Sequence, residues 1–586
     1  MIRIIKRLKP KEWLLILISV GFMALQTFLD LKLPDYMTEI TKAVQATDST
    51  MADIWKYGGY MLLSTLGSAA TAVVVGYIAA RIAAGFSKRL RSDVFNRVED
   101  FSMEEINNFS TASLITRSTN DITQIQMFIA MGMQVLIKAP ILAIWAVAKI
   151  STKSWEWTSL TGGAVALLFI MVTSIMIYAL PRFKKIQWLT DNLNRVTREN
   201  LTGIRVVKAY NAEKYEEAKF EAANSDITNN NLSVSRVMAV FHPGMTIVMS
   251  GLTLGIYWIG AYLVNGAVGM EKIGVFSDMV AFSGYAMQVI AAFMMLTMTF
   301  IILPRVSVSA RRINEVLDTQ PKILDGTVTG STTSAVGEVE FRNVSFKYPD
   351  AEEYVLHDIS FKASKGETVA FIGSTGSGKS TLINLVPRFY DVSEGQVLVD
   401  GVDVRDYTQE ALHNKIGYVP QKAILFTGTV ASNVSFGDNG GEQGTEENIL
   451  RAIDIAQGSE FVSQMEGRLE AHVAQGGTNV SGGQKQRLAI ARAIYRNPEI
   501  YIFDDSFSAL DYKTDRVLRS ALKRESAGVT SLLVAQRIGT IRDADKIIVL
   551  DEGNLVGIGT HDELMKSCEV YQQIAYSQLS KEELGA

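Results

Sequence analysis

Long runs of apolar residues dominate the first half of the chain. A bilayer hydrocarbon core of about 30 Å requires about 20 mostly apolar residues in a helix that rises about 1.5 Å per residue. Six stretches meet this requirement, and each can extend beyond the membrane as continuous helix; they centre on residues 13–29, 57–80, 129–147, 158–180, 243–264 and 275–303. The pattern therefore predicts six membrane-spanning helices in the N-terminal half.

The charged residues between these stretches predict how the helices cross the membrane, because Lys and Arg favour the cytoplasmic side. Basic residues precede the first span, at Arg3, Lys6, Arg7, Lys9 and Lys11. The connection that follows, up to Lys56, is acidic, with Asp35, Glu39, Asp48 and Asp53. Residues 81–128 and 181–241 are again basic and have helix-compatible spacing. We expect an integral protein of a bacterial-type cytoplasmic membrane, with both termini and two long helical excursions in the cytoplasm.

A different pattern begins after Arg312, where the apolar density drops. Residues 325–337 are rich in Gly, Thr and Ser and suit a linker. From Glu338 onward, short β-branched runs such as 368–372 and 499–503 alternate with helical patterns, which predicts an α/β domain with a largely parallel sheet. We expect a transmembrane domain at 1–320, a linker at 321–336 and a soluble domain at 337–586.

Composition supports a membrane protein and excludes other classes. Hydrophobic residues make up 48% of the chain, and the mean hydropathy is +0.14. A net charge of -4, with basic residues spread along the chain, gives no electrostatic reason to expect nucleic-acid binding. The single cysteine, Cys568, allows no intrachain disulfide and has no CxxC partner, so we assign it no role.

A phosphate-binding motif follows the apolar run 368–372. Residues 373–380 match GxxxxGK[ST], and their position after a strand is the one that a P-loop requires. Glycines let backbone N–H groups surround phosphate oxygens, and the positive end of the next helix adds to the attraction. Lys379 would neutralise the outer phosphates, and Ser380 would bind Mg²⁺. The candidate ATP-binding residues are Gly373, Ser374, Thr375, Gly376, Ser377, Gly378, Lys379, Ser380 and Thr381.

An acid completes this P-loop NTPase pattern. The apolar run that begins at Ile500 ends in Asp504, which would hold Mg²⁺ through water. ATP and Mg²⁺ are therefore the predicted cofactors.

Around these motifs the chain resembles the ATP-binding cassette (ABC) family, specifically exporters that fuse a six-helix domain to a cassette, and the resemblance covers nearly the whole sequence. The fragment most similar to the family's signature motif consists of Ser481, Gly482, Gly483 and Gln484. The resemblance implies a type IV exporter fold, adenine stacking on Tyr348, and a loop in which Gln421 links ATP and Mg²⁺ to the membrane helices. It also implies that two cassettes close head to tail, so that each ATP lies between one P-loop and the other chain's signature motif.

Three positions depart from the family's pattern. Asp505 stands where the family places Glu, Gln536 stands where it places His, and Gln475 stands where related exporters carry Glu. Asp505 is shorter by one methylene, and Gln536 cannot carry the charge of an imidazolium. Because general-base catalysis is worth about 10²- to 10⁴-fold in rate, this site is expected to bind ATP and to hydrolyse it slowly.

The intact signature motif suggests how ATP is nevertheless hydrolysed. It would complete the ATP site of a second, non-identical half-transporter, which supplies the missing Glu and His. The sequence thus predicts a heterodimer with one slow and one fast site. The alternative is a homodimer in which Asp505 suffices as the base.

Within the predicted spans, ionisable residues usually face a cavity or a partner because lipid exposure is costly. Lys138 lies deep and is a candidate for the transport pathway, whereas Asp278 lies near the outer end of its helix and suits a structural role. A Met-rich face of the sixth span could form an adaptable wall for substrates, although ordinary helix packing competes with this interpretation. Its members are Met287, Gln288, Phe293, Met294, Met295 and Met298.

These features together predict an ABC-type transporter ATPase that moves small amphipathic compounds, as a multidrug exporter does, out of the cytoplasm by alternating access. A dedicated exporter of a peptide, lipid or haem is a rival within this class, and a regulatory ATP-binding membrane scaffold is a rival outside it. An importer is disfavoured because importers usually keep the membrane and ATPase domains on separate chains. The expected partners are the second half-transporter, membrane lipid and the substrate.

Overall fold

The computed structural model describes residues 2–45, 50–151, 154–269, 271–330, 336–349, 351–437, 445–525 and 528–578, with only the backbone at residues 2, 133, 184, 187, 298–301 and 304. The chain divides into two compact units. The first comprises Met1–Glu99 and Ala112–Thr319, and the second comprises Asp100–Thr111 and Gln320–Ala586. The short helix α4 (Met103–Phe109) therefore belongs to the second unit, although the chain on both sides of it belongs to the first.

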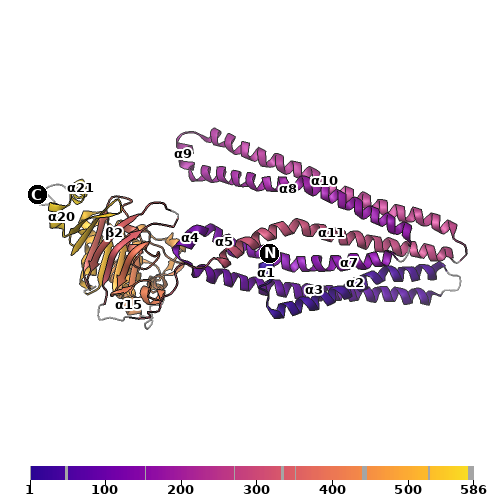
Figure 1. Cartoon of the computed structure of the whole chain (residues 1–586), viewed down its shortest axis with the longest axis horizontal. Helices are drawn as coiled ribbons and strands as arrows, with labels where there is room; N and C mark the ends of the chain where they lie inside the picture. The colour runs from indigo at the N-terminus through magenta and orange to yellow at the C-terminus, as the bar shows by residue number, and fades with distance from the viewer. Residues whose placement is uncertain are drawn as a thin grey trace. The chain divides into compact units, whose positions relative to one another are not determined.

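The first unit consists of long helices that pack side by side (Figure 1). Within the described residues, six helical stretches are long and apolar enough to cross a membrane, which confirms the six predicted spans: Pro10–Gln45, Met51–Glu99, Thr111–Ser151, Trp155–Thr202, Glu213–Gly266 and Glu271–Thr297. The helices of this unit are α1 (Ile2–Ile5), α2 (Pro10–Gln45), α3 (Met51–Glu99), α5 (Thr111–Thr116), α6 (Ile122–Met127), α7 (Met133–Ser151), α8 (Trp155–Thr202), α9 (Ile204–Ala209), α10 (Glu213–Gly266) and α11 (Glu271–Asp318), with π-helical turns η1 (Arg117–Asp121) and η2 (Phe128–Gly132) in the third span.

The acidic connection after the first span is mostly helix, in agreement with the expectation that each span can extend beyond the membrane. Asp35 and Glu39 lie inside α2, and Asp53 lies in the first turn of α3. The apolar pattern ends near residue 29, but helix formation continues because charged side chains can be satisfied on a helix without interrupting its backbone hydrogen bonds. Asp48 lies outside the described residues.

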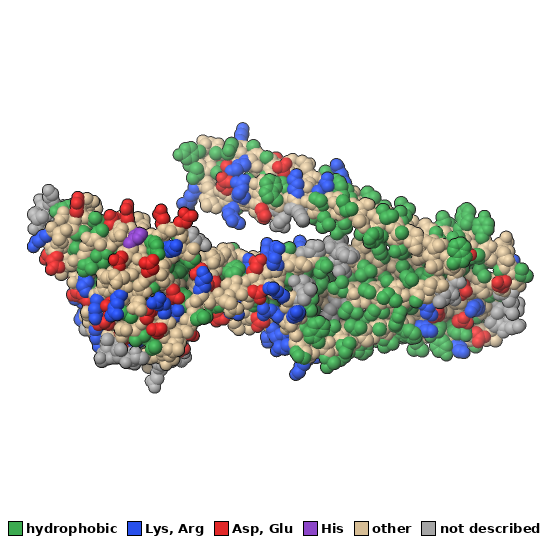
Figure 2. Space-filling view, in the orientation of Figure 1, with side chains coloured by type: hydrophobic (Ala, Val, Ile, Leu, Met, Phe, Trp, Pro, Cys, Tyr) green, Lys and Arg blue, Asp and Glu red, His purple; other side chains and the backbone are tan. Residues whose placement is uncertain are grey.

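Apolar side chains, green in Figure 2, cover much of the first unit's surface, whereas charged side chains gather toward the ends of its helices. Large hydrophobic residues such as Leu17, Val73 and Ile247 are 67%, 73% and 72% exposed. Inside the unit, the ring of Trp157 packs at a tilt against Phe282, with ring centroids 5.3 Å apart, and its indole N–H donates a hydrogen bond to the carbonyl of Ile256. Exposed apolar helix faces around a packed interior are what a bilayer environment requires, since lipid replaces water as the solvent.

The second unit is built on a ten-stranded sheet with the order β5-β4-β1-β2-β12-β11-β3-β10-β9-β6. Its strands are β1 (Val339–Phe346), β2 (Leu356–Ala363), β3 (Thr368–Gly373), β4 (Glu394–Val399), β5 (Val402–Asp403), β6 (Ile416–Val419), β9 (Ile500–Asp504), β10 (Thr530–Val534), β11 (Lys546–Asp551) and β12 (Asn554–Gly559). A small second sheet pairs β7 (Gly428–Thr429) with β8 (His472–Val473). Besides α4, the α-helices are α12 (Lys379–Asn384), α13 (Gln409–Asn414), α14 (Val430–Val434), α15 (Glu446–Ile455), α16 (Ser459–Gln464), α17 (Gly482–Tyr495), α18 (Tyr512–Glu525), α19 (Ile538–Ile541), α20 (His561–Ser567) and α21 (Glu569–Gln578).

The sheet is mixed, which corrects the expectation of a largely parallel one. The strands β11, β3, β10, β9 and β6 run parallel, whereas β1 pairs antiparallel with β2 and β4, β4 with β5, and β11 with β12. Short connections such as the one between β11 and β12 permit only antiparallel neighbours, whereas parallel neighbours need a longer crossover. The parallel strands place several loops at one edge of the sheet.

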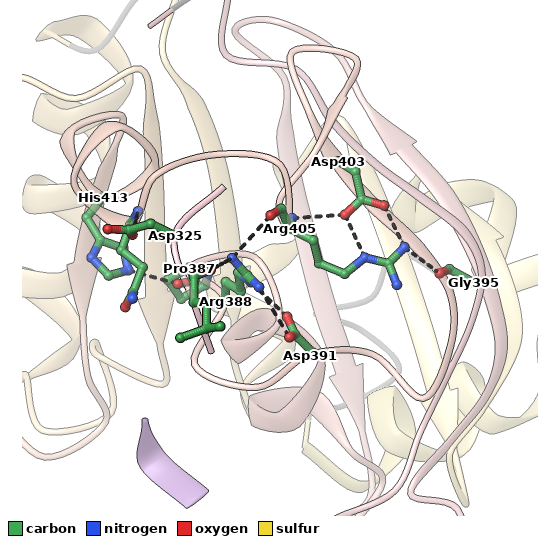
Figure 3. Close-up of polar contacts among 10 residues, drawn as sticks. Asp325, Pro387, Arg388, Asp391, Gly395, Asp403, Arg405 and His413 are labelled. Carbon is green, nitrogen blue, oxygen red and sulfur yellow. Dashed lines mark hydrogen bonds and ion pairs between the residues drawn. The ribbon is translucent and has the colours of Figure 1, made fainter. Parts of the chain in front are cut away.

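Part of the predicted linker is fastened to the second unit. The guanidinium of Arg388, whose residue is 7% exposed, donates to the carbonyl of Leu324 at 2.8 Å and pairs with Asp391 (Figure 3). Backbone bonds from Gly326 to Tyr407 and from Val328 to Asp406 continue this attachment, and residues 331–335 lie outside the described chain. The segment after α11 is therefore ordered against the sheet domain as far as residue 328.

Candidate functional site

Four parallel strands bring the predicted nucleotide residues to one edge of the sheet. The motif loop follows β3, Gln421 follows β6, Asp505 follows β9 and Gln536 follows β10. The register pairs Val534 with both Phe371 and Asp504, so these strands end at the same level. Because the carboxyl ends of parallel strands share one edge, side chains far apart in sequence converge there.

The loop after β3 has the backbone shape that phosphate binding needs. Gly376 and Gly378 have φ values of +88° and +90°, which residues with a side chain rarely adopt. A Cβ atom on Gly378 would lie 2.7 Å from a methyl carbon of Leu356. Helix α12 begins at Lys379, directly after the glycine-rich loop, and the Lys379 ammonium donates to the carbonyls of Gly373 and Ser374 at 3.0 and 2.6 Å. The loop thus places a cationic side chain beside the N-terminus of α12.

Two of the three predicted Mg²⁺ ligands lie together. The hydroxyl of Ser380 donates to Oδ1 of Asp504 at 2.7 Å, and Asp504 is 6% exposed. Both groups offer hard oxygen donors, the type that Mg²⁺ prefers. The hydrogen bond of Gln421 goes to Asp505 instead, so the third predicted ligand lies beside this pair rather than on it.

Asp505 is held by both glutamines. Its Oδ2 atom accepts hydrogen bonds from the side-chain amides of Gln536, at 2.8 Å, and Gln421, at 3.3 Å. Asp505 is 7% exposed and has a φ of +47°, in the left-handed region that Asp tolerates better than most residues. The carboxylate at the position of the base is therefore buried, and one of its oxygens is already engaged by two amide donors.

Burial and neighbouring charge shift the pKa values of the site. Burial lowers the pKa of Lys379, although the carboxylates of Asp505 and Asp504 oppose this effect. Burial raises the pKa of Asp504, and the charge of Asp505 adds to the rise. Burial also raises the pKa of Asp505. Two crowded carboxylates of this kind are stabilised by a bound cation, so the electrostatics fit Mg²⁺.

An aromatic cluster surrounds Tyr348. Its ring lies edge-to-face with Phe346 and Tyr390, at centroid distances of 5.0 and 5.3 Å. Its hydroxyl lies 3.0 Å from that of Thr381, the residue after Ser380. The ring predicted to stack on adenine is thereby attached to α12, the helix that follows the phosphate-binding loop.

The signature residues lie at the start of α17 and are accessible. Ser481 and Gly482 are exposed, whereas Gly483 and Gln484 are half-buried. The side chain of Ser481 accepts from the backbone N–H of Gln484, and the Gln484 side chain accepts from the N–H of Ser481. This capping arrangement presents the start of a 14-residue helix outward, away from the chain's own interior.

The structure also places the candidate transport residues. Lys138 in α7 forms an ion pair with Asp30 in α2, at 3.1 Å, which gives it a packing role between two spans. Asp278 in α11 is half-buried. Met287 contributes to a groove of about 640 Å³ along α10; its lining residues are His242, Thr246, Met249, Ser250, Thr253, Leu254, Tyr257 and Met287. Met294 is 38% exposed, Gln288, Phe293 and Met295 are half-buried, and the side chain of Met298 lies outside the described atoms.

The sequence analysis did not identify the ion pairs between the membrane helices. Asp30, the partner of Lys138, also accepts a hydrogen bond from Ser68. Asp35 pairs with Lys149 at 2.9 Å. An acid directly after an apolar run, as at Asp30, is the signal that could have indicated the first pair, because a charge at that depth requires a partner.

Comparisons with known proteins agree with this architecture. Residues 16–293 match the family described as ABC transporter transmembrane region, and residues 356–508 match the family described as ABC transporter. The chain is 40% identical to an uncharacterized ABC transporter ATP-binding protein of Mycobacterium tuberculosis over 94% of both chains. It is 33% identical to an ATP-dependent lipid A-core flippase of Pseudomonas fluorescens over 85% of this chain and 81% of that protein. The fold is similar to that of a bacterial Atm1-family ABC exporter with ATP bound, with a TM-score of 0.78, 23% identity, and coverage of 96% of this chain and 98% of the other.

Proposed function

The chain belongs to the ABC exporters, as a half-transporter that joins one transmembrane region to one ATP-binding domain, and from this premise we propose that it is the slow-site subunit of a heterodimeric exporter. Its own phosphate loop would bind ATP and hydrolyse it slowly. Its signature motif would complete the faster site of a non-identical partner. ATP-driven closure of the two cassettes would then switch the membrane helices between two packed states.

The observation that carries this proposal is the arrangement around Asp505. A general base must accept a proton from the attacking water within hydrogen-bond distance. Here the short Asp505 side chain is buried and Oδ2 is occupied by Gln421 and Gln536. Neither glutamine can accept a positive charge. This arrangement favours a site that holds ATP over one that cleaves it rapidly.

The proposed cofactor fits the residues that are present. Lys379 and the N-terminus of α12 would hold the phosphates, and Ser380 and Asp504 would hold Mg²⁺. When bound, Mg²⁺ supplies positive charge against the phosphate oxygens and the two carboxylates. Tyr348 would stack on the adenine.

We propose small amphipathic compounds as the substrates. The groove beside α10 combines methionine and leucine side chains with hydroxyls and one histidine, which suits a molecule with both apolar and polar parts. A dedicated lipid exporter is the second candidate, because a lipid A-core flippase is among the similar proteins. We further propose that both termini lie in the cytoplasm, on the basis of the basic residues before the first span.

Two substitutions test the slow-site assignment in the purified pair. We expect replacement of the partner's catalytic Glu by Gln to reduce ATP hydrolysis about 10²-fold or more, whereas Asp505→Asn leaves most of it. Asp545→Asn serves as a matched control, because Asp545 is an exposed acid at the opposite end of β3, where it accepts from the N–H of Thr368. The opposite ranking, or a chain that hydrolyses ATP rapidly as a homodimer, would falsify the proposal.

A further inference from the structure

Tyr390 connects two parts of the second unit that the ATP site alone does not join. Its hydroxyl accepts a hydrogen bond from the side-chain amide of Asn107, at 3.0 Å, in the short helix α4. Its ring lies edge-to-face with Tyr348, at 5.3 Å and an interplanar angle of 89°. Asn107 and Tyr390 are 283 residues apart in the sequence, so neither a local turn nor a helix repeat accounts for this contact.

The neighbours of Tyr348 link the contact between Asn107 and Tyr390 to the predicted nucleobase site. The Tyr348 hydroxyl is hydrogen-bonded to Thr381, and Phe346 packs at 5.0 Å on its ring. Edge-to-face aromatic pairs add about 0.5–1.5 kcal/mol beyond their burial and fix ring orientation. A purine base that stacks on Tyr348 would therefore press on a ring whose position depends on Tyr390.

Helix α4 is held by several contacts of its own, so a shift of the Tyr390 ring would reach it as a unit. Ser102 and Glu105 form a capping box at its start, and Glu104 forms an ion pair with Lys322. Phe101 and Phe109 stack at 5.7 Å across its ends. The chain continues from Glu99 into α3 and from Thr111 into α5, so α4 is covalently tied to two membrane helices.

Lys379 and Ser380 make no described hydrogen bond to this cluster. The hydrogen bonds of Lys379 go to its own loop, and that of Ser380 goes to Asp504 in β9. Thr381, at the start of α12, reaches the cluster through the Tyr348 hydroxyl. The described hydrogen bonds and ring contacts that link the ATP site to α4 therefore pass through Tyr348 and Tyr390. Burial raises the pKa of the Tyr390 phenol, so it stays neutral and keeps its hydrogen-bonding hydroxyl at physiological pH.

We propose that Tyr390 is a positioning residue that holds the Tyr348 ring in place for the nucleobase. Through Asn107, the same residue would make the conformational stability of α4 depend on the base of ATP rather than on its phosphates. This inference rests on the proposed binding of ATP with its adenine on Tyr348. It assigns separate roles to the two ends of the nucleotide, since the base would signal to α4 and the triphosphate would drive cassette closure.

The test compares ATP with inorganic tripolyphosphate, which lacks a base, on the full-length chain in lipid nanodiscs. We expect ATP to slow amide hydrogen exchange in residues 103–109 severalfold, and tripolyphosphate to leave it nearly unchanged. Tyr390→Phe and Asn107→Ala should remove the effect of ATP and lower the ratio of ATP to tripolyphosphate affinity about fivefold, the worth of one hydrogen bond. Tyr571→Phe, which loses a comparable bond to His561 at 2.8 Å, is the control and should behave as the wild type.

The outcomes separate the two proposals. If the wild-type chain binds no ATP, the proposed function fails. If ATP binds but exchange in α4 responds equally to ATP and tripolyphosphate, or Tyr390→Phe weakens both ligands alike, the role assigned to Tyr390 is wrong and its contacts only stabilise the fold.

Discussion

If this chain's site hydrolyses ATP slowly, as proposed, lengthening the carboxylate at position 505 should make it faster. Asp505→Glu adds one methylene and extends the side chain by about 1.5 Å. Gln536→His in the same chain removes the amide that now donates to Asp505 at 2.8 Å and restores an imidazole. Because general-base catalysis is worth about 10²- to 10⁴-fold, we expect the double variant to raise hydrolysis at this site about 100-fold.

The backbone predicts a cost for this gain. Asp505 has a φ of +47°, and a residue without the short polar side chain of Asp is disfavoured there by about 1 kcal/mol. For a domain of this size that corresponds to a decrease of about 2–4 °C in melting temperature. A lower melting temperature together with faster ATP hydrolysis in the double variant would thus agree with the described geometry.

The assay uses the pair in which the partner's catalytic Glu is replaced by Gln, so that this chain's site dominates the remaining ATP hydrolysis. Asp545→Glu, at an exposed acid at the other end of β3, is the matched control and should leave the rate unchanged. If the double variant binds ATP as tightly as the wild type yet hydrolyses it no faster, then the side-chain length at position 505 and the charge at position 536 do not limit the rate of ATP hydrolysis at this site.

Three further predictions concern the membrane pair, acid stability and the signature helix. Lys138→Ala removes the ion-pair partner of Asp30 between two spans and should lower the free energy of unfolding by about 3 kcal/mol, measured as a shift in thermal midpoint. The double variant Asp30→Asn with Lys138→Met should recover most of this loss. A double variant as unstable as Lys138→Ala would contradict the prediction. Burial holds the pKa of His413 below its usual 6.5, so the unfolded state binds the proton more readily and the free energy of unfolding should decrease as the pH falls below 6.5, by at most about 1.4 kcal/mol per pH unit. His413→Gln should flatten that dependence, and an unchanged slope would exclude His413 as its source. Gly482→Asp should fold normally because no atom lies within 4 Å of the added Cβ, yet its charge at the start of α17 should reduce ATP hydrolysis by the pair about 100-fold; normal hydrolysis would place ATP elsewhere.

Features that depend on neighbouring residues in the chain could be predicted from the sequence. The six spans follow from the length of each apolar run, because a helix satisfies its own backbone hydrogen bonds. The start of α12 at Lys379 follows from a glycine-rich loop after a buried strand. In both cases the physical cause lies within about 20 residues of the result.

Features that depend on distant residues could not be predicted. The apolar run before Asp30 indicates that this acid needs a partner, but not that the partner is Lys138, 108 residues away. The antiparallel strands of the sheet are likewise set by connections that single-strand patterns do not reveal. The grouping of α4 with the second unit belongs to the same class, since it rests on contacts such as the one from Asn107 to Tyr390.

The contact between Asp505 and Gln536 changes how the two departures from the family pattern should be interpreted. Read from the sequence, they are two separate losses, 31 residues apart. In the structure the amide of Gln536 donates directly to Asp505, so each residue satisfies a polar group of the other in a site where an unpaired carboxylate would be costly. Residues that share a hydrogen bond are expected to have non-additive effects when they are substituted. Asp505→Glu alone would have to place a longer carboxylate against the same amide, and Gln536→His alone would deprive Asp505 of its shorter hydrogen bond. Under the proposed slow-site assignment, we therefore expect that rapid hydrolysis requires both changes together.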